Sequence, residues 1–405
     1  MHICADMPLV LGLGIFRTAG FALLGYAFLA AFRFMVGLML PSLTAEFHLT
    51  PVESGFFASA ALLASVLTTA AAGYVSDRIG RKLTFTISMF VLWAGALFTA
   101  MSLDYALALA FVFIAGLGAA WLSPTIYSIM GNLRPKSRGS LIGITAASYN
   151  FGGFVASIGL GLVITLYGWR SSLVALSGLG LIYIPVMFLF MGPASSLEGA
   201  RTGKSSSVSY TSLLKSKNTL VAGASLFMAA YASFTITSWT PTYLIHIGVS
   251  SDLTGVVIGV YSLTGAIAAI VSGRLADRWG EKRLMMSTGA VAAIACLPLY
   301  LWHLDFASAL VLMAVVGFLL WPYWNLTTSM VQRLVDPAAV GSMTGLILNI
   351  GMIGGFLGPI LTGILVNYYG IELAMAGSVV VSLFLYVLLV IPFREATRGS
   401  LATSV

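Results

Sequence analysis

The chain has 405 residues, of which 59% are hydrophobic and 8% are charged. Soluble domains carry about 25% charged residues, so this chain cannot cover a water-facing surface. Its apolar residues form unbroken runs of roughly 20 residues, which predicts membrane-spanning helices and excludes a barrel of alternating strands. The net charge of +7 would indicate an anionic partner in a soluble protein. In a membrane protein it is explained by topology, and we expect no nucleic-acid partner.

Hydropathy predicts an all-α integral membrane protein with twelve transmembrane helices in two sets of six. The first set covers residues 20–43, 54–75, 83–102, 106–131, 140–166 and 171–191, and the second covers 219–246, 253–273, 284–302, 306–331, 342–367 and 372–393. We therefore expect an N-terminal half at 1–191 and a C-terminal half at 219–405. The serine-rich stretch 192–218 is expected to be a cytoplasmic linker.

The cations are distributed unevenly among the predicted loops. If the N-terminus is cytoplasmic, 18 of the 20 Lys and Arg residues fall on the cytoplasmic side. The two exceptions are Arg170, on the outer side, and Arg33, inside the first span. This bias predicts that both termini are cytoplasmic and that the protein spans the cytoplasmic membrane many times.

The two sets of spans repeat one another in sequence. The segments Gly73–Lys82 and Gly273–Lys282 match at five of ten positions. The segments Gly139–Phe154 and Gly341–Phe356, at nearly the same offset along the chain, match at six of sixteen positions. Such paired matches predict two pseudo-symmetric halves, related by an axis along the membrane normal.

The loop Gly73-x-x-x-Asp77-Arg78-x-Gly80-Arg81-Lys82 resembles the signature loop of the major facilitator superfamily, and the second half keeps part of it at Gly273–Lys282. The resemblance extends over essentially the whole chain. It implies a secondary transporter that works by alternating access and as a functional monomer. No catalytic constellation, phosphate loop or metal-ligand spacing is present in the spans, so we expect no enzyme activity, cofactor or metal.

The charges of the signature loop are candidates for a cytoplasmic gate. Asp77 could meet a helix N-terminus, and Arg78, Arg81 and Lys82 are expected to line a cytoplasmic gap. The alternative is that these cations only enforce topology. The predicted gating residues are Asp77, Arg78, Arg81, Asp277 and Arg278.

Arg33 lies about 10 residues from the end of its span, which is roughly 15 Å and half of a ~30 Å hydrocarbon layer. A cation there costs at least ~2.5 kcal/mol unless it faces protein, water or an anion. Because a guanidinium fork matches a carboxylate, Arg33 is predicted to bind an anion. The alternative is a structural arginine, in a register that begins near Pro8 and brings Arg33 close to the outer surface.

All thirteen acidic residues fall in predicted loops or tails. No acid is available within a span to pair with Arg33, so its expected counter-ion is the substrate. The same absence leaves no obvious intramembrane proton carrier, although a proton remains a possible coupling ion.

A central site also needs polar and aromatic groups at mid-depth. For most aromatic residues helix packing or an interfacial belt is the commoner role, and Trp239 and Tyr243 are predicted to belong to the outer belt. The candidate substrate-binding residues are Arg33, Trp121, Tyr127, Tyr149, Asn150, Tyr261, Trp321, Trp324, Asn325 and Asn349.

The leading functional hypothesis is transport of a small organic anion, such as a carboxylate, by uptake or exchange. The alternative is efflux of a drug-like amphipathic molecule, with the aromatic residues as the site and Arg33 structural. The fifth span lacks the Gly-Pro-rich motif that is typical of the superfamily's drug/proton antiporters, which disfavours efflux.

Overall fold

The computed structural model describes residues 7–133, 138–191, 217–302, 304–332 and 340–393. The regular structure of these residues is helical throughout. The predicted linker at 192–218 lies outside the described residues, apart from its last two residues, which begin a helix.

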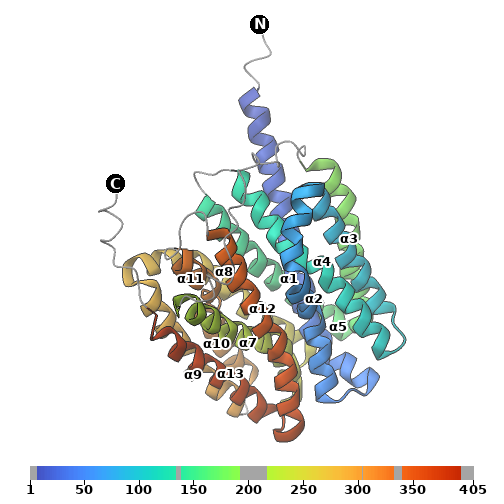
Figure 1. Ribbon diagram of the computed structural model, residues 1–405. Helices are drawn as coiled ribbons and strands as arrows, with labels where there is room; N and C mark the ends of the chain where they lie inside the picture. Colours follow the sequence, from blue (N-terminus) through green and yellow to red (C-terminus); the bar gives the residue numbers. More distant parts are fainter. Residues whose placement is uncertain (1–6, 134–137, 192–216, 303, 333–339, 394–405) are drawn as a thin grey trace.

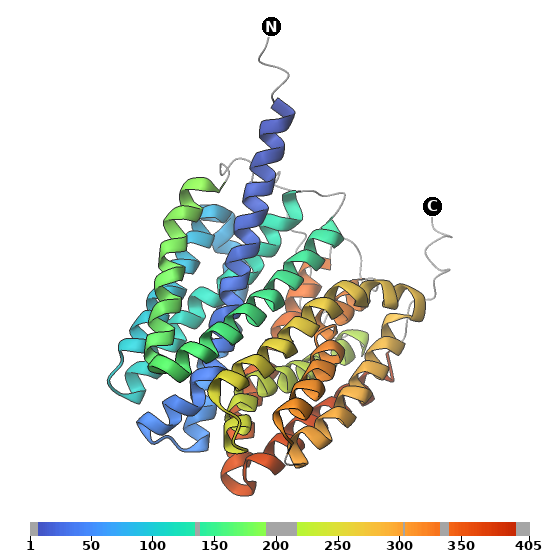
Figure 2. The ribbon, with the colours of Figure 1, turned by 180° about the vertical axis from the view of Figure 1, so that it is seen from behind.

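The helices form two groups that lie side by side (Figures 1 and 2). The N-terminal group contains α1 (Met7–Phe47), α2 (Pro51–Ile79), α3 (Arg81–Met101), α4 (Tyr105–Leu133) and α5 (Arg138–Phe190). The C-terminal group contains α7 (Lys217–His246), α8 (Ser251–Trp279), α9 (Glu281–Leu301), α10 (Phe306–Leu320), α11 (Tyr323–Gln332), α12 (Val340–Tyr369) and α13 (Ile371–Val390).

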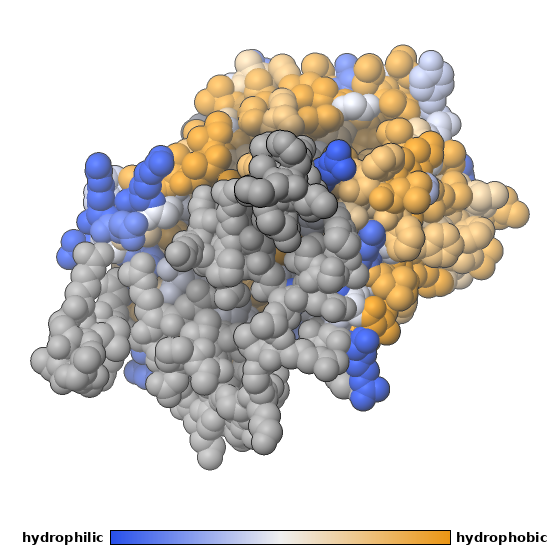
Figure 3. Space-filling model, turned by 90° about the horizontal axis from the view of Figure 1, so that it is seen from above, coloured by the Kyte–Doolittle hydropathy of each residue, from blue (hydrophilic) through white to orange (hydrophobic). Residues whose placement is uncertain are grey.

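Within the described residues, eleven helical segments are long and apolar enough to cross a membrane. Large apolar side chains remain exposed along these segments, such as Leu189 at 74% and Phe90 at 57%. Figure 3 shows apolar residues over much of the rim of the molecule when it is viewed from the end that carries the termini. A surface of this kind is stable against lipid and not against water, as the composition predicted.

The fifth and sixth predicted spans both fall on α5 and are separated at Gly168, where the backbone is non-helical with a φ of 80° and a ψ of 167°. One helix boundary differs from those predicted from hydropathy. The tenth predicted span is divided into α10 and α11 by a turn at Trp321 and Pro322, because proline has no backbone N–H to continue the helical hydrogen bonds.

The sequence repeat is also visible in the backbone turns. Gly80 and Gly280, which are equivalent in the repeat, have φ values of 88° and 84°. Gly168 and Gly370, a second equivalent pair, have φ values of 80° and 78°. Positive φ is costly for a residue with a Cβ, which explains glycine at all four positions.

The two groups approach most closely near the ends of helices that are remote from the termini. There α5 packs against α8 and α2 packs against α12. A Cβ on Gly161 would lie 2.9 Å from the Cα of Gly255, and a Cβ on Gly55 would lie 2.6 Å from the Pro359 oxygen. We call Gly55, Gly161, Gly255 and Gly363 the glycine seal, because each of them lets backbone meet backbone across the two groups.

Glycines towards the opposite ends of the same helices are not in contact. A Cβ on Gly143 of α5, Gly273 of α8 or Gly345 of α12 would have no atom within 4 Å among the described residues. The close packing between the groups is therefore concentrated at the end away from the termini.

Candidate functional site

Arg33 lies between the two helix groups. Its Nη2 atom donates a hydrogen bond to the Ser65 hydroxyl of α2 at 3.4 Å, and its Cζ atom lies 5.6 Å from the centre of the Phe234 ring on α7. The side chain is partly exposed, whereas Ser65 is buried. Among the described residues, Arg33 therefore contacts one neutral hydroxyl, through a long hydrogen bond, and one aromatic ring. Most of the N–H donors of its guanidinium group remain available.

No carboxylate of the described residues forms an ion pair with Arg33. By contrast, Arg170 does have a carboxylate partner, since its Nη2 atom lies 2.6 Å from Oε1 of Glu46. Arg33 is 14 residues from the end of α1, which corresponds to roughly 21 Å along a helix. A guanidinium at this depth with no protein counter-ion is suited to bind an anion.

Six aromatic side chains join the two groups. We call Tyr26, Phe34, Tyr127, Tyr149, Tyr261 and Trp321 the aromatic cluster. Tyr149 is central, with its ring centre 5.0 Å from Tyr26, 6.5 Å from Phe34 and 5.9 Å from Trp321. Trp321 in turn lies 5.9 Å from Tyr261. The cluster therefore crosses from α1, α4 and α5 to α8 and the end of α10.

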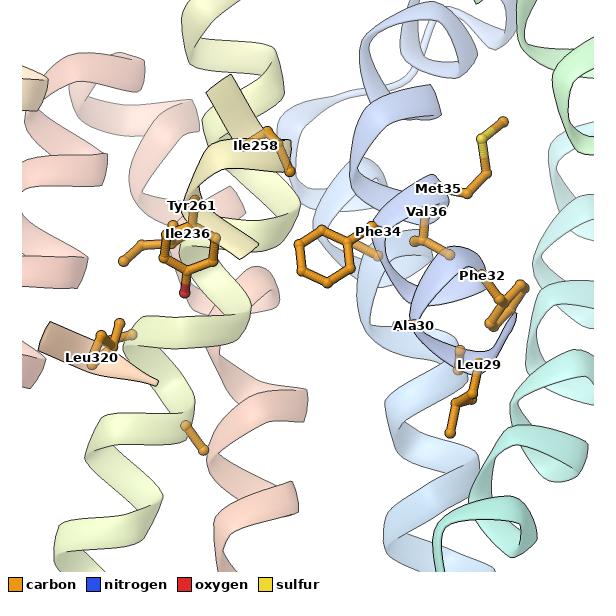
Figure 4. Close-up of a cluster of buried hydrophobic side chains, with 14 of the residues drawn as sticks. Leu29, Ala30, Phe32, Phe34, Met35, Val36, Ile236, Ile258, Tyr261 and Leu320 are labelled. Atoms are coloured by element: carbon orange, nitrogen blue, oxygen red, sulfur yellow. The ribbon is translucent and has the colours of Figure 1, made fainter. Parts of the chain in front are cut away.

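Phe34 connects α1 with the C-terminal group. Figure 4 shows its ring directed from α1 towards Ile258 and Tyr261, while Phe32 and Met35 point back among the N-terminal helices. Since Arg33 and Phe34 are neighbours in the sequence, one turn of α1 supplies both a charge and an apolar wall.

Several buried polar atoms near the middle of the helices lack a hydrogen-bond partner among the described residues. They include Nε1 of Trp321, Nε1 of Trp121 and Oδ1 of Asn150. The Asn150 amide nitrogen donates to the Ala146 carbonyl of its own helix at 3.4 Å. An unpartnered buried donor or acceptor costs free energy, which a polar ligand group could recover.

The structure brings together four of the candidates predicted from sequence, Tyr127, Tyr149, Tyr261 and Trp321, in the aromatic cluster. It adds Tyr26 and Phe34, which were not predicted as site residues because an aromatic residue in a span more often only packs against its neighbours. Ser65 and Phe234, the partners of Arg33, carry no signal in the sequence that links them to α1.

Three further candidates, Trp324, Asn325 and Asn349, belong to the C-terminal group. Trp324 packs against Tyr323, with ring centres 5.1 Å apart. Asn325, in the first turn of α11, and Asn349 on α12 are partly exposed. These residues extend the candidate site along the C-terminal group.

The predicted gating residues surround the turns at Gly80 and Gly280. The side chain of Asp77 lies outside the described set, Arg81 is partly exposed, and the exposed side chains are Arg78, Asp277 and Arg278. Lys82, which is expected to line the same cytoplasmic gap, contacts the end of α5. Its Nζ atom donates to the Met191 carbonyl at 3.0 Å, at the end of α5.

The prediction of an outer aromatic belt was wrong for Trp239 and Tyr243. Their exposed fractions are 2% and 1%. Nε1 of Trp239 donates to the Pro359 carbonyl at 2.9 Å, and the Tyr243 hydroxyl donates to the Trp302 carbonyl at 3.4 Å. Both residues are buried in the C-terminal group, because α12 and the end of α9 cover this face of α7.

Comparison with known proteins identifies the class. A model of the Major Facilitator Superfamily matches residues 22–359 and again 246–404. The hexuronate transporter of Bacillus subtilis is 26% identical over 84% of this chain and 85% of its own length. The cis,cis-muconate transport protein of Acinetobacter baylyi is 25% identical over 91% of this chain and 92% of its own length.

Solved structures share the fold. A bacterial homologue of the human lysosomal transporter Spinster, in an inward-facing and unoccupied conformation, superimposes with a TM-score of 0.75 at 15% identity, covering 93% of this chain and 95% of its own. The chain is therefore a multi-pass membrane transporter rather than an enzyme. It belongs to the Major Facilitator Superfamily.

Proposed function

We propose that this protein transports a small organic carboxylate across the cytoplasmic membrane by alternating access, and that Arg33 binds the carboxylate. One observation carries the proposal: a partly exposed guanidinium lies between the two helix groups, with no counter-ion among the described residues. The relatives named for hexuronate and muconate transport support it, because both of those substrates are carboxylates.

The fold supports a mechanism with two rocking halves. We assign six spans to each group, with α5 counted as two around Gly168, and place both termini in the cytoplasm. The glycine seal then closes the outer end, and the site is reached from the cytoplasm. Asp77, Arg78, Arg81, Asp277 and Arg278 are assigned to the cytoplasmic gate that closes when the outer end opens.

Counterflow in proteoliposomes tests the role of Arg33. A panel of radiolabelled mono- and dicarboxylates identifies a transported anion, and Arg33→Gln is then compared with the unmodified protein. A charged hydrogen-bonded pair contributes about 1.5–3 kcal/mol, so we expect a loss of transport on the order of 10- to 100-fold. Arg33→Lys should recover part of the rate, because the charge returns without the planar fork.

Arg283→Gln is the matched control, since Arg283 is an exposed cation at the start of α9. It should transport normally, and size-exclusion profiles should show that all variants are folded. Unchanged anion transport by Arg33→Gln would contradict the proposal. Measuring flux with and without a pH gradient decides whether a proton is co-transported.

The aromatic cluster favours one competing function, efflux of an amphipathic cation or neutral molecule. In that case hydrophobic cations would be transported, and Arg33→Gln would leave their flux intact. The flux of carboxylates and the flux of hydrophobic cations are both measured in the same proteoliposomes.

A further inference from the structure

Resting on the proposed function, we infer that Phe234 is a positioning residue for the anion site. Its ring holds the Arg33 guanidinium across the interface between the two groups while the glycine seal is closed. Arg33 belongs to α1 and Phe234 to α7, and the Cζ atom of Arg33 lies over the ring, 5.6 Å from its centre. An aromatic face attracts a cation at this distance. The contact therefore connects the proposed anion-binding charge of one group to the other group.

The ring of Phe234 is itself held in place by α12. A Cβ on Gly355 would lie 2.5 Å from the Cδ2 atom of the ring and 2.8 Å from its Cε2 atom, so the ring fills the place that a side chain would take. In the other group, the Ser65 hydroxyl of α2 accepts from Nη2 of Arg33 at 3.4 Å. The guanidinium is thus held from both groups, and its remaining N–H donors can face an anion.

Helices α1 and α7 touch about one turn beyond this contact. A Cβ on Gly37 would collide with the Thr237 carbonyl oxygen, so the two backbones meet there. Gly37 lies between Arg33 and the end of α1 that is remote from the termini, and Thr237 follows Phe234 on α7. When the glycine seal opens, α1 and α7 separate at this point and the ring moves away from Arg33.

The sequence repeat places Phe234 opposite Arg33. The offset between equivalent residues is 200 to 202, as between Gly168 and Gly370, and it puts the counterpart of Arg33 at 233–235. Because α1 and α7 are the equivalent first helices of the two halves and pack together, the second half supplies an aromatic face where the first supplies a charge.

The contact makes the anion affinity depend on which end of the transporter is open. With the glycine seal closed, Ser65 and Phe234 hold the guanidinium in one orientation, so a carboxylate that enters from the cytoplasm meets a preorganised fork. With the seal open, a carboxylate that enters from outside meets a guanidinium without the ring. Loss of the ring should therefore weaken binding from the cytoplasmic face alone.

Transport measured separately at each face tests the inference. Uptake of radiolabelled glucuronate and of cis,cis-muconate is measured in right-side-out and in inverted membrane vesicles, which present the outer and the cytoplasmic face. Phe234→Leu should raise the KM at the cytoplasmic face by about fivefold, and should leave the KM at the outer face unchanged or lower. Phe234→Tyr keeps the ring and should restore the KM. A role in packing alone would change the KM at both faces alike.

Phe227→Leu is the matched control, because Phe227 lies on the same helix, roughly 10 Å further along it. It should leave the KM at both faces unchanged. Equal increases of the KM at the two faces in Phe234→Leu, or no recovery in Phe234→Tyr, would overturn the inference while leaving carboxylate transport in place.

A double-mutant cycle tests the contact without transport. The Tm in detergent is measured for Phe234→Leu, for Arg33→Gln and for the double variant. Phe234→Leu should lower the Tm more in the unmodified protein than in the Arg33→Gln background, because the ring acts on the charge. Additive changes would overturn the inference. If no carboxylate is transported, the proposed function itself fails, and the cycle alone decides whether Phe234 holds Arg33.

Discussion

Lys82 and Lys282 occupy equivalent positions in the two halves, and each joins the first turn of one helix to the end of another. Nζ of Lys82 donates to the Met191 carbonyl at 3.0 Å, and Nζ of Lys282 donates to the Ile391 carbonyl at 2.6 Å. Nζ of Lys282 also donates to the Phe393 carbonyl at 2.9 Å. Phe393 is the equivalent of Met191 at the 202-residue offset that relates Gly168 to Gly370. Each lysine satisfies carbonyls that a helix leaves unpaired at its C-terminal end, where the helix dipole favours a cation.

Replacing either lysine should destabilise the protein without affecting anion binding. Lys82→Met and Lys282→Met should each lower the free energy of unfolding by about 1 kcal/mol. The double variant should lose roughly the sum, since the two sites share no partner. Thermal unfolding in detergent measures the change, with Arg283→Met as the control for loss of an exposed neighbouring cation. Equal Tm values for the lysine variants and this control would refute the capping role.

The sequence allowed the helices and the repeat to be predicted because hydropathy and backbone turns are local properties. It also singled out Arg33, since a cation in a span is costly wherever the chain folds. The partners Ser65 and Phe234 could not be found, because they come from α2 and α7 and only packing brings them to α1. For the same reason Tyr26 and Phe34 could not be told from ordinary packing residues. Trp239 and Tyr243 were misplaced because their burial depends on contacts with α9 and α12.

The glycine seal predicts that one added side chain will hinder closure of the end remote from the termini. A Cβ on Gly161 would lie 2.9 Å from the Cα of Gly255 and 3.0 Å from the Ser251 oxygen, which are backbone atoms that cannot rotate away. Gly161→Leu should therefore separate α5 from α8 and reduce transport at least tenfold. Gly159→Leu, on the same helix, is the control, because a Cβ on Gly159 has no atom within 4 Å among the described residues.

Labelling separates a hindered closure from simple misfolding. Ser157 is fully buried, and its backbone oxygen faces Gly255 across the interface. A cysteine at Ser157, in a background with Cys4 and Cys296 replaced, should react with an impermeant maleimide faster in Gly161→Leu than in Gly159→Leu. Identical labelling rates in the two variants would show that Gly161 does not hold this end closed.

The ion pair between Glu46 and Arg170 is expected to stabilise the N-terminal group modestly. Glu46 accepts from Nη2 of Arg170 at 2.6 Å and from Nε1 of Trp169 at 2.6 Å. The two charged side chains are 42% and 32% exposed, so the pair should contribute no more than about 1 kcal/mol. Arg170 additionally donates to the Ala100 carbonyl at 2.7 Å.

Arg170→Met should consequently lower the Tm more than Glu46→Gln does, and neither should change anion affinity. Thermal unfolding with and without a bound carboxylate provides both readings. A large loss of affinity in Glu46→Gln would mean that this end of α1 communicates with Arg33, contrary to the expectation.

Ser262 provides a mid-depth contact between the two groups that should respond to which end is closed. Its hydroxyl donates to the Asn150 carbonyl of α5 at 2.7 Å, and both residues are buried. Ser262→Ala removes this bond, which contributes about 1 kcal/mol, and should shift the population away from the conformation in which the glycine seal is closed.

Ser272→Ala is the matched control on the same helix, because the Ser272 hydroxyl donates to the Ala269 carbonyl of α8 itself at 3.3 Å. In the Ser157 cysteine background, Ser262→Ala should raise the labelling rate severalfold and Ser272→Ala should not. If both serine variants label alike, the bond to Asn150 is too weak to bias the equilibrium between the two conformations.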